Sequence, residues 1–199
     1  MNKDIIKFSL ILFLICFIAA VFLSGSNFIT KEKIAFQKQK EEQEALREVM
    51  PEAFSFEAVK NRANEVIFYK ALDNNADKII GCCFIASRYG YSSLIEIMVG
   101  MDTQGNIKGI KILSQAETPG LGAKIAELAV QTTLLEVLTG KAKKEEKSKP
   151  WFEERFSNKA INKLDKVETI TGATISSRAV IEAVKEKAEE IVKIAASRE

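Results

Sequence analysis

The sequence predicts an α+β domain joined to a single N-terminal transmembrane helix. An apolar run near the N-terminus is long enough to cross a bilayer. Short apolar segments rich in β-branched residues and separated by turn residues then predict an antiparallel sheet, and the C-terminal segment repeats apolar residues at helical spacing. The chain has 199 residues, 47% hydrophobic and 28% charged, which is enough for one globular domain plus this helix.

The composition excludes several classes of site. The chain has no histidine, and so lacks both the commonest general acid-base group at neutral pH and the commonest transition-metal ligand. The cysteines are Cys16, Cys82 and Cys83, and no pair has the Cys-x-x-Cys spacing of zinc or iron–sulfur ligands. We therefore expect no metal site and no catalytic triad. A net charge of +2 also argues against a nucleic-acid partner.

The first element is the apolar segment. Residues 8–29 carry no formal charge, and Phe8–Leu23 is almost entirely apolar, as a membrane-spanning helix requires. A cleaved signal peptide is the alternative, because Lys3 and Lys7 precede the run and small residues follow it. We favour a retained single-pass helix within residues 1–29, since the run exceeds a usual signal-peptide core and no Ala-x-Ala-like site ends it.

The charges around this segment leave the side of the domain open. Two lysines precede the apolar run, whereas five basic residues follow it closely: Lys31, Lys33, Lys38, Lys40 and Arg47. The positive-inside rule would then keep the main domain in the cytoplasm. The rule is weak here, because these charges stand at the head of a whole domain.

The middle of the chain predicts a helix followed by a sheet. Residues 30–50 are rich in helix formers with a sparse apolar stripe, which indicates a polar helical linker ending before Pro51. The globular domain is then expected at residues 51–199. Strands are predicted at Glu65–Lys70, Lys78–Ala86, Leu94–Val99 and Ile107–Leu113. The segment Asp102–Asn106 suits a hairpin turn between the last two, so we expect an antiparallel meander.

Two helices should flank this sheet. Ala123–Leu138 repeats apolar residues at helical spacing and stops before Gly140, and the charged segment Lys141–Lys149 then predicts a solvated loop. The final helix is expected from about Ser177 to Ala196. Its apolar face should pack on the sheet and complete an α+β domain.

A hydroxyl-rich loop precedes the final helix. The segment Glu168–Ser177 reads ETITGATISS, and its Gly172 and Ala173 are small enough to let a ligand approach the backbone. A helix N-terminus offers free N–H groups and partial positive charge, which favour a phosphate. The same residue types are also typical of a helix cap, so the residues alone leave a cap and a phosphate site as alternatives.

Two motifs carry a family resemblance. Thr171-Gly-Ala-Thr174, with the acidic Glu168 three residues earlier, resembles the flavinylation motif of the FMN-binding domain family. The segment Glu117–Ile125, ETPGLGAKI, resembles the signature of the G subunit of the Rnf ion-translocating oxidoreductase and of its relative, the C subunit of the sodium-translocating NADH:quinone oxidoreductase. Physically, the proline and glycines of the second motif predict a rigid turn between a strand and a helix.

Further features extend this resemblance over nearly the whole chain. They are the single N-terminal helix, Tyr89-Gly-Tyr91 before a strand, and Pro150-Trp-Phe152 after the charged loop. Family members often carry a histidine just before the glutamate of the second motif, whereas Gln115 and Ala116 stand there in this chain. The departure concerns a contact of that histidine and leaves the attachment motif intact.

The resemblance implies a covalently bound FMN. The phosphoester would form on Thr174, and a separate flavin transferase would attach the cofactor. Leu121 would lie against the isoalloxazine ring, and Lys124 would place positive charge near the ring's N1 and C2 carbonyl and raise its midpoint potential. The other residues implied at the site are Thr171, Gly172, Ala173, Glu117, Thr118 and Gly122. A flavin supplies its own redox chemistry, so we expect no catalytic side chain in this subunit.

The resemblance also implies a function, namely electron relay in an Rnf-type complex that couples ferredoxin:NAD oxidoreduction to sodium or proton translocation. The chain would then be a single-pass subunit of the cell (inner) membrane with its domain on the outer side. Its partners would be the other subunits, the flavin transferase and membrane lipid. Two alternatives remain: a stand-alone anchored flavoprotein feeding an extracellular reductase, and a non-redox anchored module in which Thr174 only caps a helix.

Overall fold

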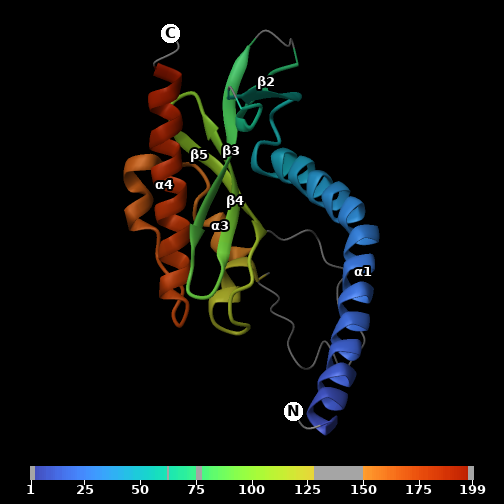
Figure 1. The fold of residues 1–199 in the computed structure, drawn as a ribbon. Helices are drawn as coiled ribbons and strands as arrows, with labels where there is room; N and C mark the ends of the chain where they lie inside the picture. The colour runs from blue at the N-terminus through green and yellow to red at the C-terminus, as the bar shows by residue number, and fades with distance from the viewer. Residues whose placement is uncertain (1–2, 62, 75–77, 128–149, 197–199) are drawn as a thin grey trace, which may run out of the picture. The chain divides into compact units, whose positions relative to one another are not determined.

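The computed structural model describes residues 3–61, 63–74, 78–127 and 150–196 (Figure 1). The chain divides into two compact units, Met1–Glu41 and Glu42–Glu199. Helix α1 (Lys3–Val49) makes up the first unit and contributes its last turns to the second.

The part of α1 in the first unit has the properties of a membrane span. Its large apolar side chains from Ile5 to Ile29 are exposed, and α1 is long and apolar enough to cross a bilayer. Such a surface is stable where lipid takes the place of a protein core. The predicted polar helix at residues 30–50 is also helical, and it continues α1 as far as Val49.

The second unit is built on a six-stranded antiparallel sheet whose strands lie in chain order. The strands are β1 (Ser55–Lys60), β2 (Val66–Leu72), β3 (Ile79–Tyr89), β4 (Leu94–Asp102), β5 (Asn106–Ser114) and β6 (Lys159–Ala160). The four predicted strands and the meander are confirmed, and β1 and β6 are additional. The predicted hairpin turn is present as well: Asp102 Oδ1 accepts the N–H groups of Gln104 (2.9 Å) and Asn106 (2.8 Å), and Gly105 has a φ of +80°.

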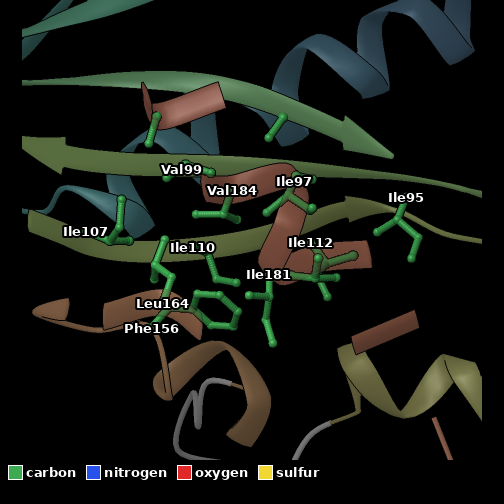
Figure 2. Close-up of a cluster of buried hydrophobic side chains, with 14 of the residues drawn as sticks. Ile95, Ile97, Val99, Ile107, Ile110, Ile112, Phe156, Leu164, Ile181 and Val184 are labelled. Atoms are coloured by element: carbon green, nitrogen blue, oxygen red, sulfur yellow. The ribbon is translucent and has the colours of Figure 1, made fainter. Parts of the chain in front are cut away.

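One face of the sheet packs against α4 (Thr174–Ala196), which lies along it in Figure 1. Figure 2 shows isoleucines of β4 and β5, among them Ile97 and Ile112, pointing toward Ile181 and Val184 of α4. The short elements α3 (Trp151–Glu154) and η2 (Ile161–Lys166) add Phe152 and Leu164 to the same core, and Phe156 joins it from the segment between them. The predicted final helix is confirmed and begins three residues earlier than expected.

The opposite face of the sheet is covered by the end of α1. Ala45, Leu46, Val49 and Met50 pack there against Ala71, Cys83 and Met98. Gly100 and Gly109 are cross-strand partners that leave room for this helix end. A Cβ atom added at Gly100 would lie 2.7 Å from the Val49 carbonyl oxygen. The last turns of α1 are therefore part of the globular domain.

The α-helix predicted at Ala123–Leu138 does not begin at Ala123. Residues Gly122–Ala126 form a 3₁₀ helix, η1, and Glu127 has an extended backbone with φ −75° and ψ 135°. Hydrogen bonds between residues three apart, such as Lys124 N–H to the Leu121 carbonyl (3.1 Å), define this 3₁₀ helix. The remainder of that predicted helix and the predicted loop Lys141–Lys149 lie outside the described residues.

Candidate functional site

A pocket of about 290 Å³ lies where α4 begins. Three segments that are far apart in the sequence form its wall: the loop between β3 and β4, the turn that leads into η1, and the start of α4. The lining residues are Tyr91, Thr118, Leu121, Gly122, Gly172, Ala173, Thr174, Ile175 and Ser176. Both sequence motifs therefore meet in one place. A larger hollow of about 390 Å³ beside β2 contains residues of neither motif.

Thr174 is the first residue of α4, and its side chain is exposed. Hydrogen bonds of Ser177 stabilise the start of α4 instead. Ser177 N–H donates to the Ala173 carbonyl (2.9 Å), and Ser177 Oγ accepts Ile170 N–H (3.1 Å). In the described part of the chain no hydrogen bond engages the Thr174 hydroxyl. An N-cap side chain accepts an N–H group of the first turn, so Thr174 does not act as a side-chain cap of α4 in this structure.

The start of α4 contributes its first three residues to the pocket wall. The first N–H groups of an α-helix have no carbonyl in a preceding turn, and they carry the positive end of the helix dipole. In α4 these groups belong to Thr174, Ile175 and Ser176, all of which line the pocket. Gly172, with a φ of +82°, lets the chain turn sharply into this position.

The ETPGLG turn forms the second wall. The Thr118 carbonyl accepts the N–H groups of Leu121 and Ala123 at 3.2 Å each, and Gly120 has a φ of +73°. Leu121 is 50% exposed, and its side chain lies next to Gly172, whose Cβ position would be 3.7 Å from Leu121 Cδ2. The two motifs therefore touch, and an exposed apolar side chain stands at their contact.

Glu117 lies behind this wall and is 4% exposed. Its carboxylate accepts the backbone N–H groups of Tyr91 (3.1 Å), Ser92 (3.0 Å) and Ser93 (2.9 Å) and the Ser176 hydroxyl (2.6 Å). Burial alone would raise the pKa of Glu117, but these hydrogen bonds outweigh it and lower the pKa to about 2. Glu117 is therefore a carboxylate at neutral pH.

The residues implied at the site by the family resemblance fall into two groups. Those that line the pocket are Thr118, Leu121, Gly122, Gly172, Ala173 and Thr174. Thr171 is exposed beside the pocket, Lys124 is partly buried in η1, and Glu117 is buried behind the wall. Sequence reasoning gave no site role to Tyr91, Ile175 or Ser176. Their positions depend on the loop and on the helix start, and the available signals were the Tyr89-Gly-Tyr91 match for Tyr91 and the hydroxyl at the second position after Thr174 for Ser176.

The cysteines of the sheet are unsuited to thiolate chemistry. Burial raises the pKa of Cys82 to about 11 and that of Cys83 to about 12, with a further increase from Asp102 and from Cys82 respectively. Both are free thiols, and they belong to the cores on opposite faces of the sheet. Their role in the described structure is packing.

Comparison with known proteins supplies the family. Residues 90–189 match the FMN-binding domain model, and residues 1–49 match the model of the RnfG N-terminal region. The G subunit of the ion-translocating oxidoreductase complex of Vibrio parahaemolyticus is 32% identical over 171 residues, covering 80% of this chain and 76% of the relative. The corresponding G subunit of Shewanella oneidensis is 30% identical over 196 residues, covering 93% and 88%.

A third relative has a more specific name. The G subunit of the Na⁺-translocating ferredoxin:NAD⁺ oxidoreductase complex of Acetobacterium woodii is 30% identical over 197 residues, covering 92% of this chain and 89% of the relative. The similarity thus includes the N-terminal helix, the sheet and the pocket. The chain belongs to the family of G subunits of ion-translocating (Rnf) oxidoreductase complexes, membrane-anchored proteins with an FMN-binding domain.

Proposed function

We propose that this chain carries FMN on Thr174 through a phosphoester and relays electrons in a membrane complex that couples ferredoxin:NAD oxidoreduction to sodium or proton translocation. The observation that supports this most strongly is the state of Thr174. Its exposed hydroxyl makes no hydrogen bond to another described residue, and it lies at the helix start where both family motifs meet. A residue in this state is available for modification.

The residues of the pocket fit FMN. The free N–H groups at the start of α4 are suited to a phosphate. Three exposed side chains around them, Tyr91 (72%), Leu121 (50%) and Ile175 (57%), provide an apolar surface on which an aromatic ring can pack. When bound, FMN would supply the electron-transfer chemistry itself. The chain's own residues bind the cofactor, orient it and set the charge around it.

The modification requires a separate flavin transferase. Thr174 acts in this scheme only as the acceptor: its Oγ forms the new P–O bond to the FMN phosphate and loses its proton, while the P–O bond to the leaving nucleoside monophosphate of a flavin dinucleotide donor breaks on the transferase. Its exposure at the protein surface, together with that of Thr171, would give such an enzyme access to the hydroxyl. The transferase is therefore a transient partner, whereas the other subunits of the complex are permanent ones.

The division of labour in the complex follows from what this chain contains. It has one candidate cofactor pocket among the described residues that combines both motifs; Cys82 and Cys83 are packed in the sheet, and Cys16 lies in the apolar part of α1. We assign ferredoxin binding, NAD binding and iron–sulfur clusters to other subunits. The chain would then hand electrons from one partner to another, with α1 embedded in membrane lipid.

We place the domain on the outer side of the cell (inner) membrane. A cofactor held only by noncovalent contacts would be lost once released outside the cytoplasm, and a covalent bond prevents this loss. Protease added to intact spheroplasts should then digest the domain at residues 51–199. Digestion that requires membrane disruption would place the domain in the cytoplasm instead.

The attachment site can be tested by substitution. We would express the full chain with a flavin transferase, denature it, and measure flavin fluorescence of the separated polypeptide. The wild type and Thr174→Ser should fluoresce, because both offer a hydroxyl, whereas Thr174→Ala should not. Thr169→Ala is the matched control, since Thr169 lies in the same loop outside the pocket. Fluorescence that survives in Thr174→Ala would contradict the assignment.

A further inference from the structure

The buried carboxylate of Glu117 connects all three segments of the pocket wall. Its Oε1 accepts from the Ser92 and Ser93 N–H groups and from the Ser93 hydroxyl (3.1 Å), and its Oε2 accepts from Tyr91 N–H and the Ser176 hydroxyl. Glu117 itself leads directly into the Thr118–Gly122 turn. One side chain thus joins the β3–β4 loop, this turn and the first turn of α4.

Two glycines leave room for this carboxylate. A Cβ atom added at Gly90 would lie 2.7 Å from Glu117 Oε1, and one added at Gly122 would lie 2.5 Å from Glu117 Oε2 and 2.6 Å from Ser176 Oγ. All of these separations are shorter than van der Waals contact. The backbone around the pocket is therefore shaped to enclose the Glu117 carboxylate.

The donors require a carboxylate rather than an amide. A glutamine would place an NH₂ group where one of the two oxygens now lies. The Oε1 position faces two backbone N–H groups, and the Oε2 position faces the N–H group of Tyr91. A hydroxyl can rotate to accept a hydrogen bond, but a backbone N–H cannot. In either orientation, the NH₂ group of the glutamine would face at least one backbone N–H group, and two donors cannot form a hydrogen bond.

The negative charge lies close to the pocket. Ser176 lines the pocket, and its Oγ is 2.6 Å from the Glu117 carboxylate. Hydrogen-bond donors stabilise the charge, and among the described residues no lysine or arginine forms an ion pair with Glu117. The field of this carboxylate is therefore not neutralised by an ion pair before it reaches a ligand in the pocket.

We infer that Glu117 is a positioning residue: it fixes the Tyr91–Ser93 loop and the first turn of α4 around Thr174, and its charge acts on the cofactor from behind the wall. The effect on the cofactor rests on the proposed function, whereas the effect on the wall does not. Glu117 therefore acts through Ser176 and the backbone, and it has no place on the pocket surface.

The first test concerns the wall and needs no flavin. Amide hydrogen exchange would be measured on the full chain in detergent, for the wild type, Glu117→Gln and Glu153→Gln. The control residue, Glu153, is also a buried glutamate, and it accepts Ile112 N–H (2.9 Å) in the core. In Glu117→Gln the amides of Tyr91–Ser93 should exchange at least about tenfold faster, because they lose bonds to a charged acceptor. The hydrogen-bonded amides of Ile170, Ala173 and Ser177 should also exchange faster, because the first turn of α4 loses the bond from the Ser176 hydroxyl to Glu117. Glu153→Gln should leave them unchanged.

A second variant keeps the test valid if Glu117→Gln does not fold. Ser176→Ala removes only the bond between Glu117 and α4, and leaves the charge and the loop contacts in place. Exchange should accelerate severalfold at the hydrogen-bonded amides of Ile170, Ala173 and Ser177 and remain as in the wild type at Tyr91–Ser93. Wild-type exchange in both segments for Glu117→Gln and Ser176→Ala would overturn the inference.

The second test concerns the cofactor. With a flavin transferase present, Glu117→Gln should carry severalfold less covalent flavin than Glu153→Gln. The flavin that is attached should have a more positive midpoint potential, because removing a nearby negative charge favours the electron-rich reduced form. Loading and potential both equal to the wild type would overturn the effect on the cofactor. A wild type without flavin on Thr174 would instead refute the proposed function, and hydrogen exchange would still decide the effect on the wall.

Discussion

Thr174 presents an exposed hydroxyl to the pocket, whereas Glu117 holds a buried charge behind the pocket wall. The sequence motifs predicted that both residues belong to one site, because each motif is specific and both resemble one family. The motifs did not indicate that Thr174 lies at the pocket surface whereas Glu117 is buried behind the pocket wall. That distinction depends on the Tyr91–Ser93 loop, which folds over the carboxylate and supplies most of its donors.

Glu117 should make the stability of the fold depend on pH in the acid range. The pKa of Glu117 is lowered from 4.5 to about 2, so its contribution to stability is complete above pH 4.5 and is lost as the pH falls toward 2. The contribution is on the order of 3 kcal/mol. Urea unfolding between pH 7 and pH 2 should show a steeper loss of stability for the wild type than for Glu117→Gln. Parallel curves would show that the carboxylate is not stabilised in the folded state.

Lys124 should influence the midpoint potential of the bound flavin. This residue is partly buried in η1, close to the turn that lines the pocket but outside the lining itself. If its ammonium group lies near the flavin N1 and C2 carbonyl, Lys124→Ala should lower the midpoint potential, since a positive charge favours the anionic reduced flavin. Lys124→Arg keeps the charge and should change the potential less. An unchanged potential in the alanine variant would count against this role.

The ETPGLG turn contains two glycines that are required for different structural reasons. Gly120 needs a positive φ in open space, whereas Gly122 needs the space that a Cβ atom would occupy. Substitution with alanine should therefore cost about 1 kcal/mol of unfolding free energy at Gly120 and more, about 2–3 kcal/mol, at Gly122. Chemical denaturation of the two variants measures the difference directly. A cost at Gly120 equal to or greater than that at Gly122 would contradict the crowding around Glu117.

The sheet and the final helix could be predicted because their burial patterns are simple. β3, β4 and β5 contain apolar, β-branched runs, and α4 places Val180, Val184 and Ile191 on one face. β1 (SFEAVK) is half polar, because it lies at an edge of the sheet, and β6 has only two residues that pair with β5. Tertiary contacts define both strands, so no local pattern indicated them. The cause is different for η1, where local hydrogen bonds of the turn, such as Lys124 N–H to the Leu121 carbonyl, form a 3₁₀ helix at the predicted start of an α-helix.

The contacts of the last turns of α1 define where the globular domain begins. Ala45, Leu46, Val49 and Met50 cover one face of the sheet, although the sequence placed the domain start after them, at Pro51. A fragment of residues 42–199 should be soluble and should unfold cooperatively. A fragment of residues 51–199 should be less stable or aggregate, because it exposes Ala71 and Met98. Equal thermal stability of the two fragments would contradict this boundary.

Membership of a complex separates the proposed function from a stand-alone flavoprotein. Because this chain is similar over most of its length to subunits of multi-subunit complexes, we expect other membrane subunits to co-purify with it after mild detergent extraction. A variant lacking residues 1–29 provides the control for association through the membrane helix. Isolation of the full chain alone, still flavinylated and reduced by a soluble donor, would favour the stand-alone alternative.

Peptide mass spectrometry of the protein from its native membrane tests the central claim most directly. The peptide that contains Thr174 should carry the added mass of FMN less one water, located on Thr174 by fragmentation. That result would establish a covalent flavin at the start of α4. An unmodified Thr174 peptide from membranes that are active in ferredoxin:NAD oxidoreduction would contradict the account, and Thr174 would then be only the first residue of a helix.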